Sequence, residues 1–252
     1  MVPRSIFLDL EPNSHLNPDR LQFEHRSPID KIKTGPFKKL FDSEQLLSHK
    51  ADALTFGEGY HNEFIDESLE GIRKITERCD SMQGFMIFNA ISGGTGSGFS
   101  SMVLERLADE FDQKSKLAFS IYPTDFDHPS RYPGNSIIEP YNAVMHLSKL
   151  IHNVDISFTL ENSAIYRVCR DKLRIERPTY GNLNRMMAQV ISSLTISLRR
   201  SSDFNIDINE YQTNLVPFKK RHFMLASYAP LKSNEETPSS YSVEQMTQDV
   251  FE

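Results

Sequence analysis

The sequence has few cysteines, no excess of basic residues and no long apolar run, and each absence excludes a class of protein. The two cysteines among its 252 residues, Cys79 and Cys169, are far apart and form no CxxC pair, so we expect neither a disulfide framework nor a zinc site. With 28 basic and 34 acidic residues and no basic stripe carrying aromatics, the net charge of −6 argues against a nucleic-acid partner. No apolar run could span a bilayer and the start lacks a signal-peptide profile, so we expect a soluble intracellular chain without a membrane partner.

What the sequence does contain is an alternation of strand-like and helix-like stretches, which is typical of an α/β fold with crossover helices. The expected strands cover residues 6–8, 85–88, 117–122, 156–160 and 221–229. The expected helices cover residues 64–79, 99–111, 140–150 and 180–199, and a Ser242-x-x-Gln245 capping box predicts one more. Residues 13–60 are polar and interrupted by Pro and Gly, so we expect mostly loop there, with a short helical piece near 43–49.

Two apolar stretches carry expectations about burial. The continuous run Phe85–Phe88 predicts a strand that is covered on both faces. The segment Tyr180–Arg199 has apolar residues on nearly all sides, which predicts a helix buried in the interior of the protein.

Residues 92–98, Ser-Gly-Gly-Thr-Gly-Ser-Gly, stand between an expected strand and an expected helix. At such a junction backbone N–H groups converge at the positive end of the helix dipole, which favours an anion. Glycines permit unusual dihedral angles and let phosphate oxygens reach the main chain. Thr95 and Ser97 can add hydroxyl donors, and Ser100 or Ser101 can cap the helix. The segment therefore predicts a phosphate-binding loop, against the plainer alternative of a flexible glycine turn.

The spacing of the glycines excludes two familiar phosphate loops. A Walker A loop ends in Gly-Lys-Ser/Thr, but Gly98 is followed by Phe99 and no lysine is near. A dinucleotide fingerprint, G-x-G-x-x-G, that starts at Gly94 would require a glycine at position 99. A dinucleotide-dependent oxidoreductase is therefore disfavoured, and a phosphate cradle of another kind remains.

The glycine segment resembles the signature loop of the tubulin family, and the resemblance continues in the same order along nearly the whole chain. The segments that carry it are VPRSIFLDLEP, QGFMIFNAISGGTGSGFSSMVLERL, KSKLAFSIYP, IIEPYN, ERPTYGNLNR and INEYQTNLVPF. The α-tubulin branch fits best, because KSKLAFSIYP and Glu210 in the last segment are similar to α-tubulins. The β-tubulins carry a lysine in place of that glutamate.

The resemblance implies a fold, a division into domains and a function. Residues 1–200 would form an α/β, parallel-sheet, Rossmann-like tubulin GTPase domain that lacks its first strands, and residues 201–252 the beginning of an α+β intermediate domain. The implied function is that of a GTP-binding structural constituent of microtubules, which uses GTP and Mg²⁺ in the cytoplasm and cytoskeleton. The implied partner is a β-tubulin-like subunit, both in a heterodimer and along the polymer.

For the phosphates of GTP the resemblance implies residues Ser92, Gly93, Gly94, Thr95, Gly96, Ser97 and Gly98. It places Glu11 in the Mg²⁺ and phosphate region, with Asp9 nearby. Two carboxylates beside a triphosphate are consistent only with a cation between them, because they otherwise repel the anion. By itself, Asp-x-Glu at a strand end is more typical of a solvated turn.

The same resemblance implies four residues for the nucleoside. Asn162 would hydrogen-bond the nucleotide, Tyr180 would stack on the base and Asn184 would bind the base edge, as amides and aromatic rings can. Asn135 is placed beside the ribose, within a lengthened loop. Without the family, Tyr180 would be a packing residue at a helix start and Asn184 a polar group of a buried helix.

Glu210, with Asp207 three residues earlier on one helix face, matches the acidic pair that α-tubulins present across a longitudinal contact. There the glutamate helps activate water against GTP held by the next, β-type subunit, so hydrolysis is completed between two molecules. The plainer interpretation is a surface acid at a helix end.

The sequence also departs from the family. The family's first strand, the loop and helix after it and the second strand have no counterpart, so the strand of QGFMIF would lack a neighbour on one side. Each unsatisfied buried backbone group costs about 1–3 kcal/mol, whereas a domain is stable by only about 5–15 kcal/mol. We therefore expect the isolated chain to bind GTP weakly or not at all, and not to build normal polymer with tubulin. The alternative function is that of a degenerate or partial tubulin paralogue.

Overall fold

The computed structural model describes residues 3–10, 28–49, 51, 53–122, 137–200, 205–231 and 242–251. The chain forms two compact units. The first contains Met1–Met82, Ala90–Lys114 and Gly134–Asn153, and the second contains Gln83–Asn89, Ser115–Pro133 and Val154–Glu252. The division at residue 200 that the resemblance implies stays a prediction. No helix within the described ranges combines the length and apolar character that crossing a bilayer requires.

Helices dominate the first unit, beside a short pair of strands. Its elements are β1 (Phe7–Asp9), α1 (Pro28–Thr34), the 3₁₀ turn η1 (Ser43–Gln45), β2 (Leu46–Ser48), α2 (Phe56–Tyr60), α3 (Ile65–Glu77), the π-helical turn η2 (Thr95–Phe99), α4 (Ser100–Glu110) and α5 (Glu139–Asn153). α3 packs on α4, and α2, α4 and α5 all contact η2. The helices expected from apolar periodicity at 64–79, 99–111 and 140–150 are confirmed.

Residues 28–60 hold more regular structure than the sequence predicts. α1 and α2 lie in a stretch expected to be mostly loop, and the helical piece expected near 43–49 is wrong beyond Gln45, since Leu46–Ser48 form β2. β2 runs parallel to β1, with Phe7 opposite Leu46. A strand of three residues is too short to show an alternation of apolar and polar side chains, so its pairing with β1 decides its conformation.

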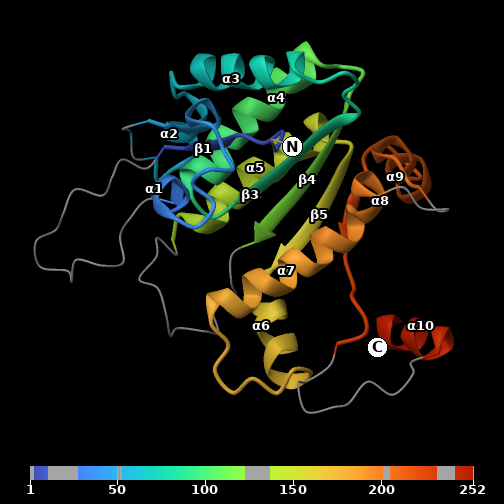
Figure 1. The fold of residues 1–252 in the computed structure, drawn as a ribbon. Coiled ribbons are helices and arrows are strands. Elements are labelled where there is room, and N and C mark those ends of the chain that lie inside the picture. The colour runs from blue at the N-terminus through green and yellow to red at the C-terminus, as the bar shows by residue number, and fades with distance from the viewer. Residues whose placement is uncertain are drawn as a thin grey trace, which may run out of the picture. The chain divides into compact units, whose positions relative to one another are not determined.

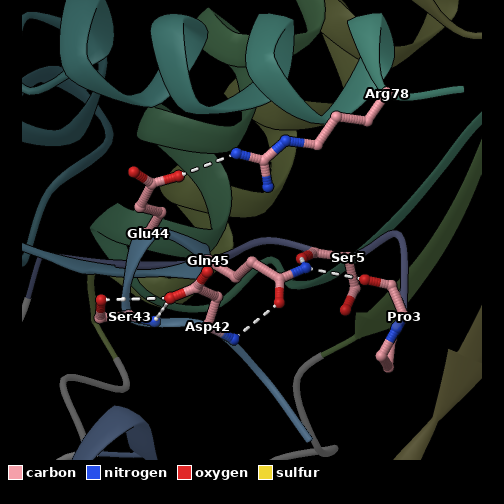
Figure 2. Close-up of polar contacts among 7 residues, drawn as sticks. All are labelled: Pro3, Ser5, Asp42, Ser43, Glu44, Gln45 and Arg78. Atoms are coloured by element: carbon pink, nitrogen blue, oxygen red, sulfur yellow. Dashed lines mark hydrogen bonds and ion pairs between the residues drawn. The ribbon is translucent and has the colours of Figure 1, made fainter. Parts of the chain in front are cut away.

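A buried glutamine holds the chain before β1 against η1 (Figure 2). Gln45 is only 4% exposed, and its Nε2 donates to the carbonyl oxygens of Pro3 (2.7 Å) and Ser5 (3.0 Å). Its Oε1 accepts a hydrogen bond from the Asp42 N–H (2.9 Å), which completes the capping box of η1. The amide therefore satisfies its buried donors and acceptor together, as a buried polar side chain must.

The second unit is built on a sheet of four strands. Its elements are β3 (Gly84–Ala90), β4 (Ser115–Tyr122), β5 (Ile156–Glu161), α6 (Asn162–Asp171), α7 (Tyr180–Leu194), α8 (Ile196–Arg199), α9 (Ile208–Leu215), β6 (Phe223–Leu225) and α10 (Val243–Phe251). The strand order is β3-β4-β5-β6, and the pairs β4–β5 and β5–β6 are parallel (Figure 1). The predicted α/β class is confirmed, as is the capping box that begins α10 at Ser242 and Gln245.

One face of this sheet carries the apolar core of the second unit. Phe119 of β4 lies opposite Phe158 of β5, and the two rings stack with their centroids 5.0 Å apart. Phe88 of β3 stacks on Phe119 at the same distance, so an aromatic ladder crosses three strands. Apolar side chains of α7, α8 and α9 cover this face, namely Ile191, Leu194, Leu198, Ile208 and Tyr211.

Both expectations about burial are wrong. In β3 every residue keeps some exposure and Phe88 is 56% exposed, because β3 is an edge strand of the sheet. The predicted buried helix breaks at Thr195, and its two parts, α7 and α8, bury only Leu183 and Met187. Apolar residues around a helix predict complete burial only if neighbours cover every side, and the sheet covers α7 and α8 on one side.

The buried amide of Gln45 generates the first prediction. Gln45→Glu replaces the donor that faces Pro3 O and Ser5 O by an acceptor oxygen, so we expect the free energy of unfolding at pH 7 to fall by about 1–3 kcal/mol. Glu44→Gln is the matched control, because the Glu44–Arg78 ion pair (3.3 Å) is more than half exposed and contributes ~1 kcal/mol or less. Urea unfolding followed by circular dichroism measures both, and equal stabilities of the two variants would contradict this account of Gln45.

Candidate functional site

The glycine segment 92–98 is the beginning of a helix. It follows the carboxyl end of β3, where Gly94 has α-helical dihedral angles (φ −66°, ψ −37°). Thr95–Phe99 form η2, and the chain continues into α4 without a break. No described glycine has a positive φ. The expectation that these glycines adopt unusual dihedral angles is therefore wrong, because the segment winds directly into the helix.

Close approach of the main chain explains the glycines instead. A Cβ added to Gly94, Gly96 or Gly98 would lie closer than 3.0 Å to a carbonyl oxygen, that of Ala53, Ala90 and Phe56 respectively. Real Cβ atoms do not come so near, so only glycine fits at these three positions. Gly93 differs, since it is exposed and an added Cβ would meet nothing within 4 Å. The segment is thus tightly packed along its helical part and open at Gly93.

Three serine hydroxyls are occupied inside this helix. Ser97 Oγ donates to Gly93 O (2.6 Å), Ser101 Oγ to Ser97 O (2.6 Å) and Ser100 Oγ to Gly96 O. Ser97 and Ser101 are fully buried. The expectations that Ser97 offers a donor to an anion and that Ser100 or Ser101 caps the helix are therefore wrong. The reason is that the helix begins before them and their hydroxyls bond to carbonyls of the preceding turn.

Asn142 of α5 joins the glycine segment to the loop before α2. Its Nδ2 donates to Ser92 O (2.9 Å) and Leu54 O (3.0 Å), and its Oδ1 accepts from the Phe56 N–H (2.8 Å). The side chain is 2% exposed. Glu58 closes the same loop by accepting from the N–H groups of Thr55 and Leu54, and the Thr55 bond in particular lowers the pKa of the Glu58 carboxyl.

His146, one turn after Asn142, holds the other end of the segment. Its Nδ1 lies 2.7 Å from Ser101 Oγ and 2.9 Å from Ser97 O, and the ring is fully buried. Burial lowers the pKa of His146 from 6.5 to about 4, although the hydrogen bond with Ser97 O opposes this shift. The imidazole is therefore neutral near pH 7. Sequence reasoning missed both residues, because their i, i+4 spacing on an expected helix does not distinguish buried side chains from exposed ones.

A polar cluster ties α2, α4 and α5 together around η2. Tyr60 Oη donates to Glu105 Oε2 (2.5 Å), and Lys149 Nζ donates to both oxygens (3.0 Å each) and lies 4.7 Å from the centre of the Tyr60 ring. The Tyr60 bond, and then the Lys149 bond, lower the pKa of the Glu105 carboxyl. About a third of each charged side chain is exposed, so the cluster contributes modestly to stability.

Asp9 is the last residue of β1 and is partly buried. It thus stands at the carboxyl end of a strand that runs parallel to β2, and the glycine segment likewise follows the carboxyl end of a strand, β3. Glu11 and Asn135, the other predicted Mg²⁺ and ribose residues, lie outside the described residues. Within the described ranges no three His, Cys, Asp or Glu side chains gather closely enough to hold a metal ion by themselves.

The residues predicted to bind guanine belong to the second unit. Asn162 begins α6 directly after the carboxyl end of β5. Tyr180, 52% exposed, begins α7, and Asn184 follows one turn later and is also exposed, so the two share one face of the helix. Thr179 fixes the start of α7 through a capping box with Asn182. α6 and α7 pack together near the end of β5 (Figure 1).

Asp207 and Glu210 form a capping box at the start of α9. Asp207 is the N-cap residue, and its N–H donates to Glu210 Oε2 (3.1 Å). Gln83 Nε2 also donates to Asp207 Oδ1 (3.0 Å). Both acidic residues are exposed. Asp207 therefore precedes the helix rather than sharing a helix face with Glu210, because Asp-x-x-Glu satisfies the first N–H groups of a helix.

Comparison with known proteins gives a consistent result. The model of the "Tubulin/FtsZ family, GTPase domain" matches residues 1–170. The chain is 46% identical over 256 residues to the tubulin alpha-2 chain of Eleusine indica, an alignment that covers all of this chain and 53% of that protein. The tubulin alpha-3 chain of Zea mays and the tubulin alpha-1 chain of Arabidopsis thaliana are also 46% identical, each covered to 52%. The chain thus spans about half the length of the curated relatives it matches.

The contrast between Gly96 and Gly93 generates the second prediction. Gly96→Ala forces the Ala90 carbonyl to move, so we expect stability to fall by more than ~2 kcal/mol or the chain not to fold. In Gly93→Ala the added methyl group has no atom within 4 Å, so we expect the free energy of unfolding to stay within about 0.5 kcal/mol of that of the unsubstituted chain. Thermal unfolding compares the two, and similar losses from both would show that close packing does not select glycine here.

Burial of His146 generates a prediction about pH. The depressed pKa means that the unfolded chain binds a proton more readily than the folded one, so this stabilising contribution is complete above pH 6.5 and declines as the pH falls toward 4. The loss over this range is about 3 kcal/mol. Urea unfolding at pH 7.5 and 4.5 should show a larger decrease for the unsubstituted chain than for His146→Asn, which cannot titrate. Equal decreases would mean that His146 is not held neutral by the fold.

Proposed function

The chain belongs to the tubulin family, and from this premise we propose that it is a GTP-binding cytoskeletal chain of the α-tubulin type. The observation that carries the proposal is the open backbone at Gly93, where the helix of η2 and α4 begins after the carboxyl end of β3. In parallel α/β sheets, ligands bind beyond the carboxyl ends of the strands.

The phosphates of GTP would lie at the start of this helix. The first N–H groups of a helix have no partner within it, and the helix dipole adds positive potential there, so a triphosphate is attracted without a lysine. At Gly93 no Cβ keeps phosphate oxygens from the main chain. Gly94, Gly96 and Gly98 would contribute indirectly, since they hold the helix in place against its neighbours.

Mg²⁺ fits the residues at the end of β1. Mg²⁺ is usually held by one or two carboxylates together with phosphate oxygens and water, and Asp9 offers one such carboxylate in the first unit. Glu11 would be the second. When bound, the ion would neutralise phosphate charge. Phosphate oxygens of the nucleotide would complete its coordination.

The guanine base would be bound by residues of the second unit. Tyr180 presents an exposed ring at the start of α7, and a ring offers a face on which a base can stack. Asn184 on the same helix face, and Asn162 after β5, each offer an amide donor and acceptor for the base. Asn135 would reach the ribose.

Glu210 would act on a nucleotide held by another subunit, with Asp207 beside it. Both side chains are exposed at the start of α9, where a partner can reach them. In the chain by itself one oxygen of the Glu210 carboxylate, Oε2, accepts the N–H of Asp207, and the other oxygen would orient the water. A β-tubulin-like subunit in the cytoplasmic microtubule cytoskeleton would be the partner.

A second candidate is a tubulin-family chain that does not bind GTP by itself. The observation that favours it is the place of β3, which is an edge strand of its sheet with Phe88 56% exposed. The glycine segment directly follows this strand, so the proposed phosphate site would be attached to a strand that has one neighbour in the described sheet.

Calorimetric titration with GTP and Mg²⁺ tests the proposal. We expect weak one-to-one binding, with a dissociation constant of about 100 μM or higher, because β4 is the one neighbour of β3 among the described strands. GMP should bind at least ~10-fold more weakly, since it lacks two phosphates, and Gly93→Ala should weaken GTP binding by about tenfold, or 1.4 kcal/mol. Gly57→Ala is the matched control, because Gly57 is equally unobstructed. Absence of saturable heat would favour the second candidate. Equal affinities of the two glycine variants for GTP would show that the phosphates do not bind at Gly93.

A further inference from the structure

α5 places two buried polar side chains against opposite ends of the glycine segment. Asn142 donates to the carbonyl oxygen of Ser92 (2.9 Å), and His146, one turn later, lies 2.9 Å from the carbonyl oxygen of Ser97. Each contact joins a side chain of α5 to a main-chain carbonyl of the segment. Neither residue projects to the surface, since they are 2% and 0% exposed.

These contacts determine the direction of main-chain N–H groups. In a trans peptide the C=O of one residue and the N–H of the next point in opposite directions across a rigid plane. When Asn142 holds Ser92 O toward α5, the N–H of Gly93 points away from α5. Gly93 is the exposed residue of the segment, so this bond turns the N–H group of an exposed residue away from α5.

The hydrogen bonds at Nδ1 of His146 favour one tautomer. Ser97 O only accepts, and it lies 2.6 Å from Ser101 Oγ and 2.9 Å from His146 Nδ1. If the Ser101 hydroxyl donates to Ser97 O, then Nδ1 must carry a hydrogen, because a bare nitrogen would face an oxygen lone pair. The Nδ1–H tautomer satisfies all three groups together.

We propose that Asn142 and His146 are positioning residues that hold the glycine segment in the shape that binds phosphate, an inference that rests on the proposed GTP site. Neither touches the nucleotide. Asn142 orients the peptide at Gly93, and His146 holds the Ser97 carbonyl in the middle of η2. Asn142 also bonds to Leu54 and Phe56, so it fixes the loop whose carbonyls pack on Gly94 and the first residue of α2, whose carbonyl packs on Gly98.

The side-chain geometry of histidine allows a test by near-isosteric variants of the full-length chain. His146→Asn places an amide N–H where Nδ1 lies, whereas His146→Gln moves the amide toward the position of Nε2, and His146→Leu removes it. His152→Asn is the control, since His152 is exposed on the same helix. We expect His146→Asn to bind GTP within about twofold of the unsubstituted chain, and the Gln and Leu variants about fivefold more weakly, which corresponds to one lost hydrogen bond.

Two NMR measurements make the test independent of GTP binding. In the unsubstituted chain, ¹⁵N shifts of the imidazole should report the Nδ1–H tautomer, and the opposite tautomer would overturn the proposal even if no variant folds. The amide signals of Gly93 and Gly98 should move more in His146→Leu than in His152→Asn. Unmoved signals, or equal GTP affinities of the Asn and Leu variants, would also overturn it. If the unsubstituted chain binds no GTP, the proposed function fails, while the tautomer and amide signals still decide whether α5 positions the segment.

Discussion

The first unit depends on how closely one stretch of main chain approaches its neighbours. At Gly94, Gly96 and Gly98 the backbone lies where even a methyl group would meet a carbonyl oxygen. This closeness lets η2 pack against α2, α4 and α5. Within the same segment, the buried hydroxyls of Ser97 and Ser101 bond to carbonyl oxygens of the preceding turn. Side chains of α5 and the cluster of Tyr60, Glu105 and Lys149 then hold the surrounding helices, so the glycine segment is the point on which these contacts converge.

Sequence patterns predicted the elements that are long enough to show a repeating or continuous apolar pattern, or that begin with a capping box. α3, α4 and α5 show apolar residues at helical spacing, β4 and β5 are apolar strands, and the Ser242 capping box begins α10, so the α/β class was predictable. The tubulin family assignment followed from ordered segments rather than from periodicity, and the comparisons confirm it. β2 could not be predicted, because three residues carry no pattern and the pairing with β1 is a tertiary effect. The burial of Phe88 was mispredicted for a related reason, since an apolar run does not reveal whether its strand lies at the edge of a sheet.

The place of the glycine segment between a strand and a helix was predicted, but its conformation was not. The glycine segment does follow a strand and begin a helix, yet its glycines serve close packing rather than unusual dihedral angles. Asn142 and His146 were missed because a polar residue in a helix is usually exposed, and only the folded chain shows that these two are buried against carbonyls. Asp207 and Glu210 lie at the surface, and their capping box explains their spacing without any catalytic role. A catalytic role for them therefore stays a proposal, based on the family resemblance.

Hydrogen–deuterium exchange of the full-length chain, with and without GTP and Mg²⁺, tests the central claim most directly. The claim is that main-chain N–H groups at the start of the η2–α4 helix receive the phosphates. It predicts that GTP slows exchange at residues 93–96 while the amides in the second half of α4 keep their rates. Unchanged exchange across residues 93–96, under conditions where GTP is bound, would contradict it.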